Sequence, residues 1–295
     1  MTTVAQLLRA TERRLASAGI EDARLEAEVL VGHALRLTRE ALLARLQEPT
    51  KKGTAAASVA LLRRVRHEPA AYITSHREFF GLDLACTPAA LIPRPETELL
   101  VELALAYIAA RPAPALERSE GTRDPQPLVA DVGTGSGAIA IAIAVHAPEA
   151  RVVAVDTSRA ALLLARRNAR AHGVAGRIDF VQASLLDALR GPFDIVAANL
   201  PYIPTRLYRA LPPEILDHEP QAALHAGRRG TAVIEALLEQ AAARLRPGGL
   251  LLAEHAWNQG RRLRDAAHAS FPRARIETKR DLAGLERVLV IQPEP

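Results

Sequence analysis

Cysteine is almost absent from this chain: Cys86 is the one cysteine among 295 residues. A single cysteine excludes an internal disulfide framework and a zinc site built from several cysteines. Three of the histidines, His146, His172 and His218, do not have the spacing of metal ligands. The sequence therefore predicts no metal site.

Aromatic residues and long apolar runs are also scarce. Aromatic residues make up 3% of the chain, so stacking surfaces for single-stranded nucleic acid are few. No apolar stretch approaches the roughly 20 residues that a membrane span needs, and residues 138–144 are better interpreted as a buried helix. The first residues lack the basic, apolar and small-residue order of a signal peptide. We therefore expect a cytoplasmic protein without a membrane partner.

The composition that remains is typical of a soluble globular protein. Hydrophobic residues make up 49% and charged residues 24% of the chain, and the length suits about two domains. The net charge of +5 favours acidic partners such as nucleic acid or ribonucleoprotein. An arginine-rich composition alone can produce the same charge, so nucleic acid is neither required nor excluded as a partner.

Three regions follow one another along the chain. Residues 1–72 carry apolar residues at helical spacing, interrupted at Gly19 and Pro49, and predict a small helical bundle without chemistry of its own. Residues 73–95 predict a β-hairpin connector. A third region, 96–295, begins with a helix and contains a proline-rich stretch, residues 111–127, that predicts a surface loop.

The third region alternates strands and helices. This rhythm predicts a mostly parallel sheet covered on both faces. The loop between the last two strands is too short for a crossover helix, so they should form an antiparallel hairpin at or near the sheet edge. The predicted strands are residues 128–132, 151–156, 177–182, 193–198, 249–254, 273–279 and 286–291.

A glycine-rich loop follows the first of these strands. Gly133, Gly135 and Gly137 fit a tight turn from strand to helix, where the backbone must approach a ligand closely. Asp131 precedes the loop and Asp156 ends the next strand, where an acidic residue accepts hydrogen bonds from ribose hydroxyls in doubly wound folds. Asp156 could instead cap the following helix, although Thr157 or Ser158 could fill that role.

An aspartate followed by Gly-Thr-Gly-Ser-Gly, together with the terminal hairpin, resembles the class I S-adenosylmethionine-dependent methyltransferases. The resemblance implies an α/β fold with a seven-stranded, mostly parallel sheet, here preceded by a small α-helical bundle. It also implies S-adenosylmethionine as the cofactor, with Leu185 near the adenine. The cofactor-binding residues would be Asp131, Gly133, Thr134, Gly135, Ser136, Gly137, Asp156, Ser184, Leu185 and Asn199.

The stretch ANLPYIP, residues 198–204, forms a corner after the fourth strand. Asn199 offers a side-chain carbonyl, and Leu200 offers a backbone carbonyl because Pro201 favours an extended residue before it. Two acceptors can hold both hydrogens of an NH2 group, while Tyr202 supplies a flat wall. This corner fits methyl transfer to a planar amide or an aromatic amine. The alternative is a proline-stiffened turn capped by asparagine.

The corner resembles the Asn-Pro-Pro-Tyr motif of amino-methyltransferases, with Leu200 in place of the first proline. That motif occurs in DNA adenine methyltransferases and in protein glutamine methyltransferases, so it does not choose the substrate. The stretches IPRPETELL (residues 92–100), ARLEAEVLVGHAL (23–35) and LPPEILDHEPQAAL (211–224) resemble the HemK/PrmC family, the glutamine methyltransferases of peptide chain release factors.

This second resemblance implies methyl transfer to the side-chain amide nitrogen (N5) of the glutamine in the Gly-Gly-Gln loop of class I release factors. The helical region, residues 1–72, would bind the release factor, and the methyltransferase domain would span 96–295. The catalytic residues would be Asn199, Leu200, Pro201 and Tyr202, and Arg94 and Glu96 would also line the substrate site.

Several alternatives stay open on the sequence alone. Arg94 and Glu96 could form a structural ion pair. Glu254, His255 and Gln259 lie where the chain departs from the family pattern, and their place near the pocket is undecided. The chain could also be a nucleic-acid amino-methyltransferase, a glutamine methyltransferase of a ribosomal protein, or a binder of S-adenosylmethionine without activity.

Overall fold

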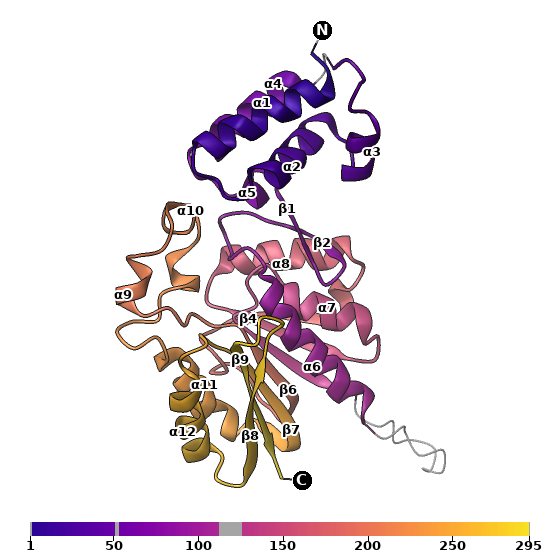
Figure 1. Cartoon of the computed structure of the whole chain (residues 1–295). Coiled ribbons are helices and arrows are strands. Elements are labelled where there is room, and N and C mark those ends of the chain that lie inside the picture. Colours follow the sequence, from indigo (N-terminus) through magenta and orange to yellow (C-terminus); the bar gives the residue numbers. More distant parts are fainter. Residues whose placement is uncertain (1, 51–52, 112–125, 295) are drawn as a thin grey trace, which may run out of the picture. The chain divides into compact units, whose positions relative to one another are not determined.

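The computed structural model describes residues 2–50, 53–111 and 126–294 (Figure 1). They form two compact units. The helical unit comprises Met1–His76 and Leu211–Glu219, and the sheet unit comprises Arg77–Ala210 and Pro220–Pro295. Most of the predicted proline-rich loop, residues 112–125, lies outside the described residues.

The helical unit buries one apolar stripe from each of its longer helices. Val4, Leu8 and Leu15 recur at helical spacing on the first helix and pack with Leu30 and Leu42. The first helix begins with a capping box between Thr3 and Gln6. The elements are α1 (Val4–Ser17), α2 (Ala23–Leu35), α3 (Arg39–Ala44), α4 (Thr54–Arg64), α5 (Ala70–Thr74) and the distant α10 (Pro213–Leu216).

A buried arginine joins α10 to the other helices of this unit. The Arg64 side chain is 3% exposed and donates to Glu26 on α2 and, over 2.7 Å, to Glu214 on α10. The sequence predicts one continuous domain over 96–295, whereas residues 211–219 belong to the compact unit of the helices. Residues 211–219, which follow the corner and residues 205–210 along the chain, are therefore a part of the helical unit.

The sheet unit contains a seven-stranded sheet in the order β5-β4-β3-β6-β7-β9-β8. The first five strands are parallel, and β9 runs antiparallel to both β7 and β8. The predicted terminal hairpin is thus confirmed, with β8 at the edge. The strands are β3 (Leu128–Val132), β4 (Arg151–Asp156), β5 (Ile178–Gln182), β6 (Phe193–Ala198), β7 (Leu245–Glu254), β8 (Ala274–Arg280) and β9 (Glu286–Pro293).

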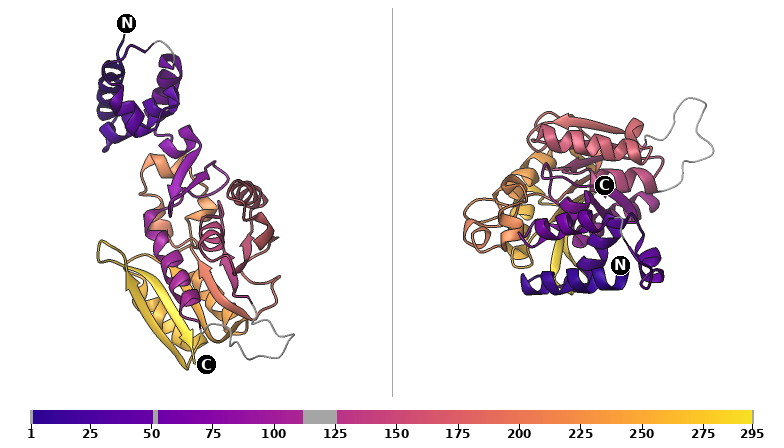
Figure 2. Two further views of the ribbon diagram at one scale, coloured as in Figure 1. Left: turned by 90° about the vertical axis from the view of Figure 1, so that its right-hand side faces the viewer. Right: turned by 90° about the horizontal axis from the view of Figure 1, so that it is seen from above.

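Helices cover both faces of this sheet (Figure 2). The helices α6, α7 and α8 pack on one face, and α11 and α12 pack on the other. The helical and turn elements of the unit are η1 (Pro95–Thr97), α6 (Glu98–Ala109), α7 (Ala138–His146), α8 (Arg159–Ala171), η2 (Ala175–Arg177), α9 (Thr205–Tyr208), η3 (Gln221–Ala223), α11 (Ala232–Ala242) and α12 (Gly260–Ser270). A two-stranded hairpin, β1 (His76–Phe79) and β2 (Leu82–Ala85), precedes them.

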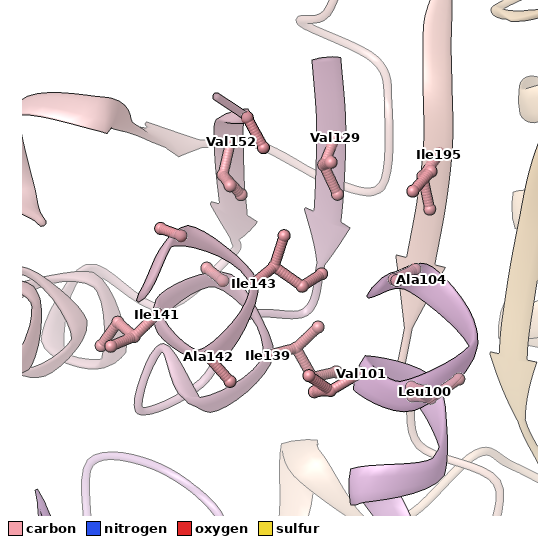
Figure 3. Packing of buried hydrophobic residues seen from close by; sticks show 14 of the residues in the cluster. Leu100, Val101, Ala104, Val129, Ile139, Ile141, Ala142, Ile143, Val152 and Ile195 are labelled. Carbon is pink, nitrogen blue, oxygen red and sulfur yellow. The ribbon is translucent and has the colours of Figure 1, made fainter. Parts of the chain in front are cut away.

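Branched side chains alternate between the two faces of the central strands. In Figure 3, Val129, Val152 and Ile195 face α7 and α6 from three neighbouring strands. Residues 130 and 196 point to the opposite face, toward α11. Strands buried on both faces read as continuous apolar runs, which explains why the sequence predicts them well. This rigid core fixes where each strand ends.

The Arg64 cluster gives a test of stability. Glu26→Ala leaves the buried guanidinium with only the partly exposed Glu214, so the free energy of unfolding should fall by roughly 3 kcal/mol. Arg64→Met removes the buried charge itself and should cost less. Glu12→Ala removes a partner of the exposed Arg24 and should cost much less than Glu26→Ala, because water and salt screen a surface pair. Urea unfolding of the full chain measures all three, and equal losses for Glu26→Ala and Glu12→Ala would contradict this account.

Candidate active site

The site begins where three parallel strands end side by side. Val132, the last residue of β3, pairs with Val155 on β4 and with Ala198 on β6. The backbone N–H groups of Gly133 and Thr134 both donate to the carbonyl of Val155, over 2.8 and 2.9 Å. The glycine-rich loop therefore starts directly between the ends of β4 and β6. Ligands bind at this edge in open α/β sheets.

The glycines of the loop are required by its backbone and by its neighbours. Gly133, Gly135 and Gly137 have φ angles of +76°, +56° and +86°, which side chains disfavour. A Cβ atom on Gly133 would lie 2.9 Å from Cδ2 of Leu200, and one on Gly137 would lie 2.9 Å from Cδ1 of Ile141. The loop thus packs against the corner at one end and against its own helix at the other.

Asp131 holds this loop from behind. Its side chain is fully buried, and its Oδ2 accepts from Thr134 Oγ1 over 2.6 Å and from the N–H of Ala140 over 3.0 Å. Burial raises the pKa of Asp131 to about 7, while the hydrogen bond from Thr134 opposes the shift. These contacts show that Asp131 shapes the loop, and its role in cofactor binding stays a prediction.

Asp156 lies on the open side of the loop. Its Oδ2 accepts from the N–H of Gly135 over 3.0 Å, and its Oδ1 accepts from the N–H of Ser158 over 2.8 Å. Ser158 caps α8, because its hydroxyl accepts from the N–H of Ala161. The cap of this helix is therefore supplied by Ser158, which leaves lone pairs of the half-buried Asp156 carboxylate for a ligand.

A cavity of about 590 Å³ opens at this edge of the sheet. Its size matches sites for small molecules and cofactors. Its lining includes most of the residues predicted from the sequence: Arg94, Gly133, Thr134, Gly135, Ser136, Asp156, Ser184, Leu185, Asn199, Leu200 and Pro201. Four predicted residues lie outside that lining: Asp131, Gly137, Glu96 and Tyr202. The structure therefore brings the loop and the corner together around one space.

The corner is held by a chain of hydrogen bonds. Asn199 Nδ2 donates to Thr97 Oγ1 over 2.8 Å, and Thr97 Oγ1 donates to Glu254 Oε2 over 2.7 Å. The other oxygen of Glu254 accepts from the hydroxyl of Tyr202 over 3.1 Å. Tyr202 is not among the residues that line the cavity, and its role as a flat wall for the substrate stays a prediction.

Burial dominates the electrostatics of this chain of bonds. Burial raises the pKa of Glu254, opposed by the hydrogen bonds from Thr97 and Tyr202. Burial and the nearby Glu254 charge also raise the pKa of Tyr202 far above its ordinary value, so this phenol stays protonated and remains a donor. Thr97 and Glu254 are 4% and 1% exposed, and both are shielded from water.

Two further residues support the corner: Gln259, whose place near the pocket the sequence left undecided, and Gly230, which the sequence did not single out. Gln259 Nε2 donates to the backbone carbonyl of Tyr202 over 2.8 Å. Gly230 has a φ of +78°, and a Cβ there would lie 2.5 Å from the Tyr202 carbonyl oxygen. In the sequence, Gly230 is a glycine in an otherwise polar turn. This pattern does not indicate which part of the chain packs against the glycine.

Arg94 and Glu96 differ in their exposure. Arg94 is half-buried and lines the cavity at the start of η1, whereas Glu96 is exposed. Other lining residues were not predicted as site residues: residues 89–93, Pro220, Ala222, Ala223, His225, and Ala232, Val233 and Ala236 of α11. Small apolar residues carry no chemical signature, so only the fold reveals them.

Two classes of site are not found in the described residues. Across residues 2–50, 53–111 and 126–294, no group of three or more His, Cys, Asp or Glu side chains could hold a metal ion. In the same ranges, no helix is both long enough and apolar enough to cross a membrane.

Comparison with known proteins agrees with this geometry. The PrmC N-terminal domain matches residues 6–74, and the methyltransferase small domain matches residues 120–209. Among solved structures, the hMettl16 catalytic domain superposes with a TM-score of 0.57 at 15% identity, covering 78% of this chain and 84% of that one. A methyltransferase from Pyrococcus furiosus gives a TM-score of 0.51 at 15% identity, covering 73% and 91%. These two likenesses concern the fold.

Curated relatives are similar over nearly the whole length. The release factor glutamine methyltransferase of Moorella thermoacetica is 43% identical over 97% of this chain and 96% of its own. That of Deinococcus radiodurans is 38% identical over 95% of both chains. Such identity across both units, together with the loop and corner described above, shows that the chain belongs to the release factor glutamine methyltransferase family.

Proposed function

We propose that this chain transfers a methyl group from S-adenosylmethionine to the side-chain amide nitrogen (N5) of the glutamine in the Gly-Gly-Gln loop of class I peptide chain release factors. The observation that carries the proposal is the corner: Asn199 and Leu200 line the cavity directly beside the glycine-rich loop. Because release factors act on the ribosome, the proposal includes a cytoplasmic location.

The residues of the cavity fit this cofactor. The loop glycines leave a surface without side chains, and the Asp156 carboxylate is placed to accept from ribose hydroxyls. Ser184 and Leu185 also line the cavity, and Leu185 has a φ of +48°. In this proposal they contact the adenine. S-adenosylmethionine supplies an electrophilic methyl group on a sulfonium.

The corner fits a primary amide. Asn199 Nδ2 is already bound to Thr97, so its carbonyl oxygen is the group left to accept from the substrate. The Leu200 backbone carbonyl would be the second acceptor, so that both amide hydrogens are held. Two acceptors orient the nitrogen and favour the developing positive charge in the transition state. The nitrogen then loses one proton after the bond to the methyl carbon has formed, so no strong base is needed.

The helical unit would bind the body of the release factor. It supplies none of the residues that line the cavity. Val59 and Leu62 on α4 are 58% and 52% exposed and lie three residues apart, on one face of the helix. Exposed apolar side chains on one face suit a protein partner.

The direct test is mass spectrometry of a purified release factor after incubation with this protein and S-adenosylmethionine, with duplex DNA as a second substrate. We expect one added methyl group on the glutamine of the Gly-Gly-Gln peptide. Methylation of the DNA alone would overturn the proposal in favour of a nucleic-acid substrate. Methylation of neither substrate would favour a protein that only binds the cofactor.

Asn199→Ala should lower kcat on the order of 100-fold or more, because it removes one acceptor of the substrate amide. Calorimetry should show affinity for S-adenosylmethionine unchanged within about three-fold, since a three-fold change is under 1 kcal/mol. The exposed Asn258 offers a matched control, and Asn258→Ala should keep full activity. Full activity in Asn199→Ala would refute the role of the corner.

Asp156→Ala should weaken binding of S-adenosylmethionine by roughly 10- to 100-fold, because hydrogen bonds to a charged group are lost. Asp179→Ala, at an exposed carboxylate on β5, should leave the affinity unchanged. Calorimetry measures both dissociation constants. If the two variants bind equally well, Asp156 serves only the backbone of the loop.

Leu62→Glu should raise the KM for an intact release factor roughly 10-fold, because it places a charge in the proposed contact surface. The KM for a short Gly-Gly-Gln peptide should not change, since the peptide does not reach the helical unit. Leu282→Glu, in the exposed loop between β8 and β9, is the control. An equal effect on protein and peptide would contradict a binding role for this surface.

A further inference from the structure

The side-chain amide of Asn199 could face its neighbours in two ways. Rotation by half a turn exchanges its oxygen and nitrogen, which are nearly equal in size and opposite in hydrogen bonding. A corner that must accept two hydrogens works with only one of these orientations. The orientation therefore has to be set by a group other than the substrate.

The hydroxyl of Thr97, oriented by the Glu254 carboxylate, sets the orientation of the Asn199 amide. Thr97 has one hydroxyl proton to donate, and its Oγ1 lies 2.7 Å from Glu254 Oε2, which as a carboxylate oxygen can only accept. Its oxygen is then left to accept, so the part of Asn199 that faces it at 2.8 Å must be the NH2 group. The Tyr202 hydroxyl, a second donor to Glu254, holds the carboxylate in place.

We propose that Thr97 and Glu254 are positioning residues, which fix the Asn199 amide with its oxygen toward the cavity and its nitrogen toward Thr97. This inference rests on the proposed function, because it concerns how the corner presents an acceptor to the substrate amide. Glu254 does not line the cavity whereas Thr97 does, and in this proposal both residues act on the substrate only through Asn199. Both act through the polarity of one chain of hydrogen bonds.

Three features support a role beyond packing. Glu254 is 1% exposed, although apolar residues would fill such a position at lower cost. Its two oxygens bind two hydroxyls from separate segments, η1 and the corner. Within this chain of hydrogen bonds, Thr97 is the residue that contacts Asn199. It comes from a segment about 100 residues upstream of the corner.

Glu254 must be ionised for this arrangement. A protonated Glu254 could donate to Thr97, and Thr97 could then donate to the oxygen of Asn199, which reverses the amide. The charged and titratable groups around Glu254 are Arg287 on β9, Glu96 on η1 and the phenol of Tyr202. Burial raises the pKa of Glu254, so the required ionised form is lost as pH falls through that raised value.

The test compares steady-state kinetics of four variants with those of the wild type. Thr97→Val keeps the shape but cannot accept from Asn199, so kcat should fall on the order of 100-fold while the KM for S-adenosylmethionine stays the same. Thr97→Ser keeps the hydroxyl and should restore most of the rate. Thr278→Val, on β8 at the sheet edge, is the matched control and should keep full activity.

Glu254→Gln is the fourth variant. In the wild type, kcat should fall at low pH as Glu254 becomes protonated, and this acid limb should be missing in Glu254→Gln. A merely structural role would leave the acid limb in place. Full activity in Thr97→Val, or the same loss in Thr97→Ser, would overturn the proposal.

A second readout does not depend on turnover. In ¹⁵N-labelled protein, the side-chain amide signal of Asn199, identified by its loss in Asn199→Asp, should show a hydrogen-bonded NH2 group in the wild type. The signal should shift in Thr97→Val but not in Thr278→Val. An unchanged signal refutes the positioning role, whereas an inactive wild type with the expected shift refutes the proposed function alone.

Discussion

Parallel hydrogen bonding of β3 to β4 on one side and to β6 on the other is the constraint on which the rest of the site depends. The register pairs Val132 with both Val155 and Ala198, so three strands end at one level. The glycine-rich loop, Asp156 and Asn199 then follow as the next residues of each strand. No side chain has to reach far, because the sheet itself places the cofactor loop beside the corner.

Two buried carboxylates make this arrangement rigid. Asp131 ties Thr134 and the start of α7 to the end of β3. Glu254 ties η1 and the corner to the end of β7. Each is held by hydrogen-bond donors from separate parts of the chain, and burial raises the pKa of each. Burying these two carboxylates lowers the stability of the fold, but their hydrogen bonds fix the loops of the site. Functional sites often carry such a cost.

Much of this fold could be predicted from the sequence, because its strands are continuous apolar runs and its loop uses glycines that the backbone requires. The corner residues and Asp156 could also be predicted, since they follow strand ends directly. Thr97 could not be recognised as a partner of Asn199, because about 100 residues separate them and only the fold joins them. The hydrogen bond from the Tyr202 hydroxyl to Glu254 could not be predicted either, because Glu254 lies about 50 residues further along the chain. Residues 211–219 belong to the helical unit, where Glu214 pairs with Arg64, and local sequence patterns do not reveal such a distant pairing.

The most direct measurement is a crystal structure of the protein with S-adenosylhomocysteine and a peptide that contains Gly-Gly-Gln. Our account predicts that the glutamine amide nitrogen lies between the Asn199 side-chain oxygen and the Leu200 carbonyl, and points toward the cofactor sulfur. Asn199 would still donate to Thr97. A glutamine bound away from the corner, or an Asn199 amide that presents its nitrogen to the substrate, would contradict the account.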